Sequence, residues 1–306
     1  WVSNTATAIM MLPIGLSVVG MLDSGNPKGV RRYATALLLA IAYSASIGGI
    51  ATLIGTPPNA LLAAYLSENQ GISVGFAQWM LLGVPVTIIM LALAWWWLTR
   101  RDFGLGSSGD GGSAIREELV ALGPLGRGEK LVAAVFLVTA SAWIFRPLLS
   151  DSLMPWLSDT GIAIAAAIAM FIIPANTSKR EFLLDWETAR GIPWGVLLLF
   201  GGGLSMAGVI SSSGLAEWIA QSLGAAGTLP TLVMIVMVTG VIIFLTEVTS
   251  NTATAAAFLP LLGALAMSQE VSPLLLTVPA AIAASCAFMM PVATPPNAIV
   301  FASGHM

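Results

Sequence analysis

The sequence predicts an all-α polytopic membrane protein built from inverted repeats, with two re-entrant helical hairpins and two unwound transmembrane helices. Three observations lead to this prediction. The 306-residue chain is 57% hydrophobic, with a mean hydropathy of +0.89. Only 9% of its residues are charged, whereas a soluble domain carries about 25%. Finally, two polar motifs each occur twice within this apolar sequence, in the same order.

The repeated motifs indicate an internal duplication. Ser-Asn-Thr-Ala-Thr-Ala occupies residues 3–8 and 250–255, and both copies run on to a Leu-Pro pair. Thr-Pro-Pro-Asn-Ala occupies residues 56–60 and 294–298. Irregular backbone at membrane depth is tolerated only where it is buried in protein or lines a cavity. Because matching interruptions in two halves are typical of transporter binding sites, the motifs predict a transport site between the halves.

Residues 1–99 are predicted to form the first repeat. Residues 6–22 are apolar but begin at a polar motif, so they are interpreted as one arm of a re-entrant hairpin. Residues 33–66 predict a helix that is interrupted at residues 55–58 by the two prolines. Residues 79–99 are long enough to span a membrane and end in three tryptophans, which are typical of the membrane interface.

Residues 100–130 are polar and rich in Gly and Ser, so they predict a flexible cytoplasmic linker. The second repeat is predicted over residues 131–306. It comprises three spans, a hairpin and a broken helix, at residues 131–149, 160–174, 192–210, 230–267 (tip at 246–252) and 273–306 (break at 293–296). The chain opens without Met and stops soon after the second Pro-Pro pair. We therefore expect further helices before Trp1 and a last helix after Met306.

The basic residues predict the orientation. If the loop at residues 23–32 is cytoplasmic and each hairpin returns to its own side, eleven of the twelve Lys and Arg residues face the cytoplasm. The exception is Arg146. This bias is expected of a multi-pass protein in the cell inner (plasma) membrane. The two hairpins then open to opposite sides, which makes the repeats inverted, as in secondary transporters.

Composition also excludes several classes of function. Cys286 is the only cysteine and His305 the only histidine, which argues against a multi-cysteine metal site and against histidine-based catalysis. No pairing of a nucleophile with a base is evident, so an enzyme is not predicted. The net charge is -3 and no basic stripe suggests nucleic acid as a partner. The lipid bilayer is the predicted surrounding.

The chemistry of the motifs suits a cation and an anion together. A helix that ends inside the membrane leaves backbone groups unpaired. Its carbonyls, with Ser and Asn oxygens, suit sodium, and the amides of a helix N-terminus suit a carboxylate. The two prolines of each break also free the carbonyls of Gly55 and Ala293 as cation ligands. One Ser-Asn-Thr copy alone could equally be a helix N-cap, but two copies, each paired with a proline break, favour binding.

Glu247 is the acidic residue predicted to lie deep in the second hairpin. A carboxylate within a membrane is a candidate functional group. It could carry a proton, ligate a cation, or pair with a Lys or Arg outside this chain, and the pairing role is favoured. No Lys or Arg lies in any motif. An anion would therefore be held by amides, hydroxyls, helix ends and co-bound cations, so cations should be needed for anion affinity.

At these motifs the chain resembles the divalent anion/sodium symporter family, whose bacterial members carry dicarboxylates. The resemblance implies a homodimer in which each protomer has a scaffold domain and a transport domain that moves as an elevator. It implies sodium ions as co-transported partners and no organic cofactor. The dicarboxylate would touch Asn4, Thr5, Ser250, Asn251, Thr252 and Pro295. One sodium site would use Ser3, Asn4 and Gly55, together with a residue four positions before Ser3, and the other Thr246, Asn251 and Ala293.

Three functions remain open at this point. The first is sodium-coupled symport of C4-dicarboxylates such as succinate, malate or fumarate. The second is sodium-independent exchange, or a proton-coupled carrier of the same fold in which Glu247 titrates. The third is a scaffold or receptor that only binds its ligand. Neutral hydroxyl and amide ligands also suit tricarboxylates and sulfate, so the sequence leaves the anion open.

Overall fold

A computed structural model describes most of the chain. The described residues are 3–22, 26–100, 102–103, 116, 120, 123–152, 156–176, 181–191, 194–215, 218 and 230–305. Most of the predicted linker at residues 100–130 lies outside them. Within the described residues the protein is almost entirely helical.

The first third of the chain forms four helices. They are α1 (Asn4–Gly20), α2 (Pro27–Ile50), α3 (Pro57–Gln70) and α4 (Phe76–Thr99). The remaining helices are α6 (Arg127–Ser152), α7 (Asp159–Ile172), α8 (Trp186–Ala189), α9 (Trp194–Ser212), α11 (Thr231–Thr246), α12 (Asn251–Ser268), α13 (Leu274–Ala284) and α14 (Pro295–Phe301). One feature departs from the all-α prediction. Two short antiparallel strands, β1 (Pro174–Asn176) and β2 (Glu181–Phe182), lie between α7 and α8.

Both predicted helix interruptions are present, and their geometry follows from the prolines. The residue before a proline is driven to extended backbone. Thr56 has φ −144° and ψ 141°, and Thr294 has φ −137° and ψ 150°. The prolines themselves occupy the first positions of α3 and α14, where no N–H is needed. The interruptions begin earlier than predicted, because α2 ends at Ile50 and α13 at Ala284.

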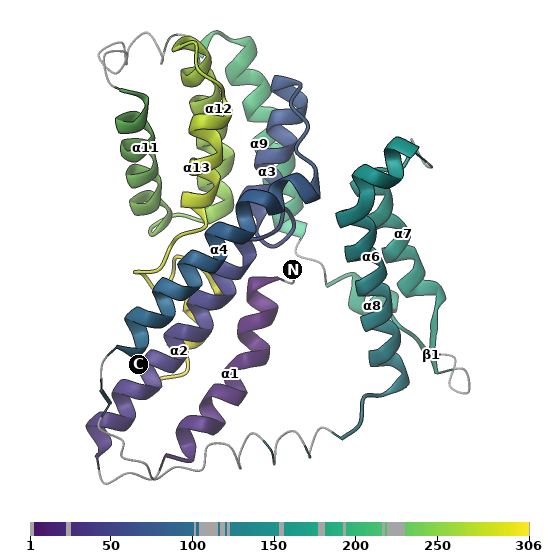
Figure 1. Cartoon of the computed structure of the whole chain (residues 1–306), viewed down its shortest axis with the longest axis vertical. Helices are drawn as coiled ribbons and strands as arrows, with labels where there is room; N and C mark the ends of the chain where they lie inside the picture. The colour runs from purple at the N-terminus through teal and green to yellow at the C-terminus, as the bar shows by residue number, and fades with distance from the viewer. Residues whose placement is uncertain are drawn as a thin grey trace.

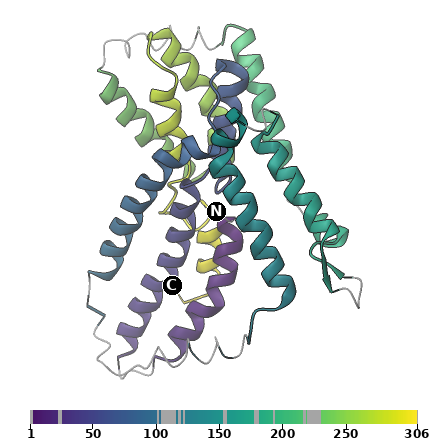
Figure 2. The ribbon, with the colours of Figure 1, turned by 45° about the vertical axis from the view of Figure 1, so that its right-hand side comes forward.

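The two halves of the chain are interlocked at the breaks. In Figures 1 and 2, α1, α2 and α4 form one end of the molecule, and α9, α11, α12 and α13 form the other. The half-helix α3 crosses to the second group and packs against α12 and α13. The half-helix α14 crosses the other way and packs against α1 and α2. The pair α6 and α7 lies to one side, where α6 contacts α4 (Figure 1).

The buried core has one part on each side of the breaks. The larger cluster joins α3, α4, α11, α12 and α13, and includes the fully buried Leu61, Leu62, Leu259 and Leu276. The smaller one joins α2 to α14 through Leu38, Ile41, Ala42 and Val300. Each cluster therefore fixes a crossing half-helix against the other half of the chain, and this packing holds the two breaks at the centre.

Four described helices are long and apolar enough to cross a membrane, namely α2, α4, residues 127–149 of α6, and α12. In the most apolar 18-residue stretch of α4, only 11% of the residues are buried, and in that of α6 only 6% are buried. Such outward apolar surface suits lipid or further helices. At the end of α4 the exposed tryptophans of residues 95–97 adjoin Arg100, whose guanidinium lies 3.6 Å from the ring centroid of Trp97. This cluster has the character of an interfacial belt.

Candidate functional site

The largest described cavity lies where the repeated motifs meet. It has a volume of about 1070 Å³ and is lined by both Ser-Asn-Thr tips and both proline breaks. The site residues predicted from the sequence line it, except Thr246. They are Ser3, Asn4, Thr5, Gly55, Ser250, Asn251, Thr252, Ala293 and Pro295. Thr246 is fully buried beside this cavity and contacts Asn251. The fold thus brings residues from the two ends of the chain to one place.

Both Ser-Asn-Thr tips are the starts of helices. Ser3 is the N-cap residue of α1 and Ser250 that of α12, but neither side chain caps its own helix. Simple N-capping therefore does not account for these serines. The first turn of a helix has N–H groups without intrahelical partners and carries the positive end of the helix dipole. Two such ends face the cavity, which suits an anion with two carboxylates.

Asn4 faces two backbone carbonyls, one in α2 and one in the break. With its amide turned one way, the nitrogen donates to the carbonyl oxygen of Ala45 at 2.8 Å and of Gly55 at 3.2 Å. The two ends of an amide have nearly the same shape. With the amide reversed, its oxygen takes that place and three oxygens converge. Oxygens this close repel one another unless a cation or a hydrogen-bond donor lies between them, and the cluster shares Asn4 and Gly55 with the first predicted sodium site.

Gly49 forms one wall of this oxygen cluster. A Cβ atom at Gly49 would lie 2.5 Å from Oδ1 of Asn4 and 2.9 Å from the carbonyl oxygen of Gly55. A Cβ at Gly55 would in turn collide with the carbonyl of Gly49. The end of α2 and the break after it therefore approach each other, and Asn4, too closely for any side chain.

The second oxygen cluster centres on Thr246 at the end of α11. Its hydroxyl lies 2.8 Å from Oδ1 of Asn251 and 3.0 Å from the carbonyl oxygen of Ala284. Ala293, whose backbone carbonyl is the third predicted ligand, is buried in the wall of the motif cavity. Amide, hydroxyl and carbonyl oxygens again gather without a charged group, as at the first cluster.

Glu247 binds backbone rather than another side chain. Its Oε1 accepts N–H bonds from Phe288 at 2.7 Å and Met289 at 3.0 Å, and its Oε2 from Met289 at 3.1 Å and Met290 at 2.8 Å. Among the described residues no Lys or Arg forms an ion pair with Glu247, and pairing with a Lys or Arg outside this chain stays a prediction. The carboxylate instead ties the hairpin tip to the unwound segment 287–290 that follows α13.

The same unwound segment is also held from the first half of the chain. The hydroxyl of Tyr43, in α2, donates to the carbonyl of Phe288 at 2.8 Å, and the two rings meet edge to face at 5.1 Å. Side chains from the hairpin tip and α2 thus satisfy the polar backbone of a segment that has no helical bonds of its own. This is the requirement for irregular backbone inside a membrane.

The lining of the cavity carries no charged side chain. Among the described residues no group of three or more His, Cys, Asp and Glu could hold a metal ion. The oxygen clusters offer neutral ligands only, which suits a hard monovalent cation rather than a transition metal. A dianion in this cavity would meet helix N-termini, hydroxyls and amides, but no Lys or Arg.

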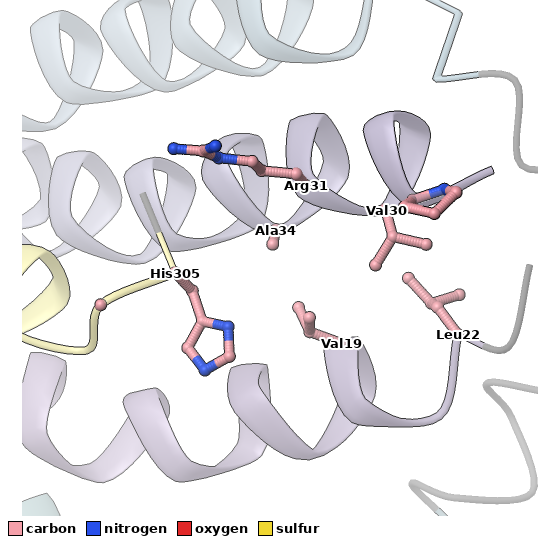
Figure 3. A pocket seen from close by; sticks show the side chains of 8 residues that line it. Val19, Leu22, Val30, Arg31, Ala34 and His305 are labelled. Carbon is pink, nitrogen blue, oxygen red and sulfur yellow. The ribbon is translucent and has the colours of Figure 1, made fainter.

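A second cavity, of about 420 Å³, shares no lining residue with the first. Figure 3 shows it between α1 and α2, with Val19 and Leu22 on one side, Val30 and Ala34 on the other. The imidazole of His305 points between the two helices, while the Arg31 guanidinium extends away along α2 (Figure 3). No residue predicted to bind substrate or sodium lies there, so the motif cavity is the candidate site.

Comparison with known proteins agrees with these motifs. The family described as "Sodium:sulfate symporter transmembrane region" matches residues 1–306. The chain belongs to this family. It is 43% identical over 319 residues to the sodium-dependent dicarboxylate transporter SdcS of Staphylococcus saprophyticus, and 42% identical to SdcS of Staphylococcus aureus strain USA300. The alignments cover 100% of this chain and 61% of each relative.

Membership has direct consequences. The family resemblance predicted from the motifs is confirmed. The chain is part of a transporter family rather than an enzyme family, and it is a multi-pass protein of the plasma membrane. It spans 61% of the length of the relatives that it matches.

Sequence reasoning missed Ala45, Gly49 and Ala284. Ala45 and Ala284 take part only through backbone carbonyls, which no residue type announces. Gly49 did carry a signal, because a Gly-Gly pair directly before a helix break often marks a close backbone approach. The partners of Glu247 were also missed, since they are N–H groups that any residue would supply.

Proposed function

We propose that the protein is a sodium-coupled symporter of C4-dicarboxylates such as succinate, malate and fumarate. The observation that carries this proposal is the cavity in which two helix N-termini and two clusters of neutral oxygens meet without any charged side chain. The name of its relatives, sodium-dependent dicarboxylate transporter, supports a dicarboxylate over sulfate.

Coupling follows from the balance of charge. A dicarboxylate brings two negative charges into a cavity that has no basic residue, and an uncompensated charge inside a membrane is costly. Sodium ions at the two oxygen clusters would neutralise it. We assign the first ion to Ser3, Asn4 and Gly55, joined by Ala45, and the second to Thr246, Asn251 and Ala293, joined by Ala284. The anion would lie between Asn4, Thr5, Ser250, Asn251, Thr252 and Pro295.

The proposed architecture is a pair of inverted repeats with re-entrant hairpins. Helix α11 has 16 residues, which corresponds to about 24 Å at 1.5 Å per residue, short of the ~30 Å hydrocarbon core. The mutual exchange of α3 and α14 between the halves supports the inverted arrangement. Residues 1–99 and 131–306 would be the two repeats, joined by a cytoplasmic linker at 100–130. We further propose a homodimer that transports by an elevator motion.

The contacts of Glu247 favour a structural role for this residue. Both carboxylate oxygens accept backbone N–H bonds. Through these bonds the carboxylate holds the N–H groups of residues 288–290, which lie outside any helix. We therefore assign Glu247 a structural function within the symporter.

The decisive experiment is uptake of radiolabelled succinate into proteoliposomes that contain the full-length protein. An inward sodium gradient should drive accumulation, and replacement of sodium by choline should abolish it. Flux that occurs only against preloaded dicarboxylate, and is indifferent to sodium, would show an exchanger instead. Excess unlabelled sulfate should compete poorly, and strong competition would point to a sulfate carrier.

Asn251→Ala tests whether one residue serves both ligands. Its amide lies against Thr246 in the second oxygen cluster and also lines the cavity. The variant should lose both succinate uptake and its stimulation by sodium. Normal sodium-stimulated uptake by this variant would eliminate the shared-site arrangement.

A further inference from the structure

The asparagines that end the two Thr-Pro-Pro-Asn motifs are buried, and they face the break rather than the cavity. Asn59 is 0% exposed and Asn297 is 7% exposed. Neither lines the motif cavity. Each stands in the first turn of a half-helix, α3 or α14. Asn59 reaches back to the end of α2 and the break after it, and Asn297 reaches back to the unwound segment after α13.

Their side-chain amides donate to backbone carbonyls in matching positions. Nδ2 of Asn59 lies 2.9 Å from the carbonyl oxygen of Thr52 and 3.4 Å from that of Gly49. Nδ2 of Asn297 lies 3.1 Å from the carbonyl oxygens of Met290 and Ala287. In both halves the acceptors stand seven and ten positions before the asparagine. The same contact is thus built twice, although the residues that accept the bonds differ in type.

In each half, one carbonyl that accepts a bond from the asparagine also accepts a bond from a residue proposed to bind sodium. The Thr52 carbonyl also accepts the N–H of Gly55, at 3.4 Å, and the Met290 carbonyl accepts the N–H of Ala293, at 3.2 Å. Each forms a four-residue turn, which Asn59 or Asn297 holds from outside. A turn fixed at its first carbonyl also fixes the direction of the peptide at its last residue. In the first half that last residue is Gly55, whose carbonyl faces Asn4; in the second half it is Ala293, which lines the cavity.

The donors of these amides, and not their oxygens, make the described contacts. Oδ1 of Asn59 and Oδ1 of Asn297 are both buried without a hydrogen-bond partner. Reversing either amide would set its oxygen against two or more carbonyls. A side chain of the same size without donors would leave these carbonyls unpaired in a dry environment, which is costly.

We propose that Asn59 and Asn297 are positioning residues that set the sodium affinity of the first and second sites, each through the turn before its half-helix. Neither residue touches sodium or substrate. This inference rests on the proposed sodium-coupled function, and it extends that function to a pair of residues outside the binding cavity.

The test compares Asn59→Leu and Asn297→Leu with Asn69→Leu in the full-length protein. Asn69 lies at the far end of α3, where its amide donates to the Tyr65 carbonyl within the same helix. Sodium is titrated against choline, with thermal unfolding and succinate uptake as readouts. Without the asparagine amide the turn is no longer held, and sodium should bind more weakly. The sodium concentration that gives half of the maximal effect should therefore rise on the order of tenfold in Asn59→Leu and in Asn297→Leu. Asn69→Leu should match the unaltered protein.

A purely structural role would give a different pattern. It would lower the unfolding temperature in choline while leaving the half-maximal sodium concentration unchanged, and that result would overturn the inference. Should a leucine variant fail to fold, Asn59→Ser and Asn297→Ser keep one donor and should show a smaller shift in the same direction. An unshifted serine variant would then count against the inference. If the unaltered protein itself ignores sodium, the proposed function fails, and the inference fails with it.

Discussion

Two neighbouring glycines near the end of α2 have very different surroundings. A Cβ at Gly49 would press on the Asn4 amide and the Gly55 carbonyl, whereas a Cβ at Gly48 would meet nothing within 4 Å. Overpacking of this kind costs about 1–3 kcal/mol. Gly49→Ala should therefore weaken sodium binding roughly 5- to 150-fold. The measurement is the half-maximal sodium concentration for succinate uptake.

Gly48→Ala is the matched control for this prediction, because both substitutions gain the same helix propensity. It should leave the sodium titration unchanged. Equal effects of the two substitutions would mean that helix stiffness at the break matters and that contact with Asn4 does not.

Residue types revealed some parts of the site and concealed others. Ser, Asn and Thr side chains recur visibly, and the sequence alone led to residues that the fold gathers around one cavity. Backbone ligands are different, because Ala45 and Ala284 contribute carbonyls that every residue has. The direction of Glu247 was equally hidden, since its partners are the N–H groups of an unwound segment. That segment exists only because α13 ends earlier than its apolar sequence suggests.

At the scale of elements, helix α9 contains three consecutive glycines at residues 201–203, and only one of them brings it close to α12. A Cβ at Gly203 would lie 2.7 Å from Cβ of Ala256, while one at Gly202 would meet nothing within 4 Å. Close approach through small residues is a common basis of helix packing in membranes. Gly203→Ala should therefore be less stable than Gly202→Ala by about 1–3 kcal/mol, since only one of them must push the helices apart.

Thermal unfolding of the two variants in the same detergent checks this difference. Both gain about 1 kcal/mol of helix propensity, which cancels in the comparison. A pair of equal unfolding temperatures would show that α9 does not depend on this contact. Because α12 begins at Asn251, a loosened contact could also be followed as weaker sodium stabilisation.

Helix existence was easier to predict than helix ends. Long apolar runs and proline pairs located every major helix and both interruptions. The exact ends depend on tertiary contacts: the last carbonyls of α2 are taken by the indole N–H of Trp79, at 2.9 Å from the Ile50 oxygen, and by Asn59. The short β1–β2 pair was missed, because strands of two and three residues carry too little pattern to recognise.

At the scale of the whole molecule, the exchange of half-helices makes the site depend on both halves. Helix α3 is buried among second-half helices and α14 among first-half helices. Neither oxygen cluster could keep its geometry if the halves separated, since Tyr43 and Thr56 of the first half bond to Phe288 and Ser285 of the second. In the proposed transport motion, both tips and both breaks should therefore move as one body.

The orientation of the whole chain can be tested with single cysteines. Lys28, Lys130 and Thr160 are exposed at the first turns of α2, α6 and α7. If α2 with α3 crosses the membrane once and α4 returns, Lys28→Cys and Lys130→Cys should react with an impermeant maleimide only from the cytoplasmic side. Because α6 then crosses again, Thr160→Cys should react only from outside.

Cys286, the only cysteine of this chain, is buried, and its replacement by Ser, with that of any other native cysteine, gives the background for labelling. Labelling of Lys28→Cys and Lys130→Cys from opposite sides would mean that the broken helix is not one crossing, and the inverted repeat would lose its basis. Labelling of all three from the reversed sides would keep the crossings but invert the molecule. Eleven of the twelve basic residues would then face outward, against the positive-inside rule, so this outcome is not expected.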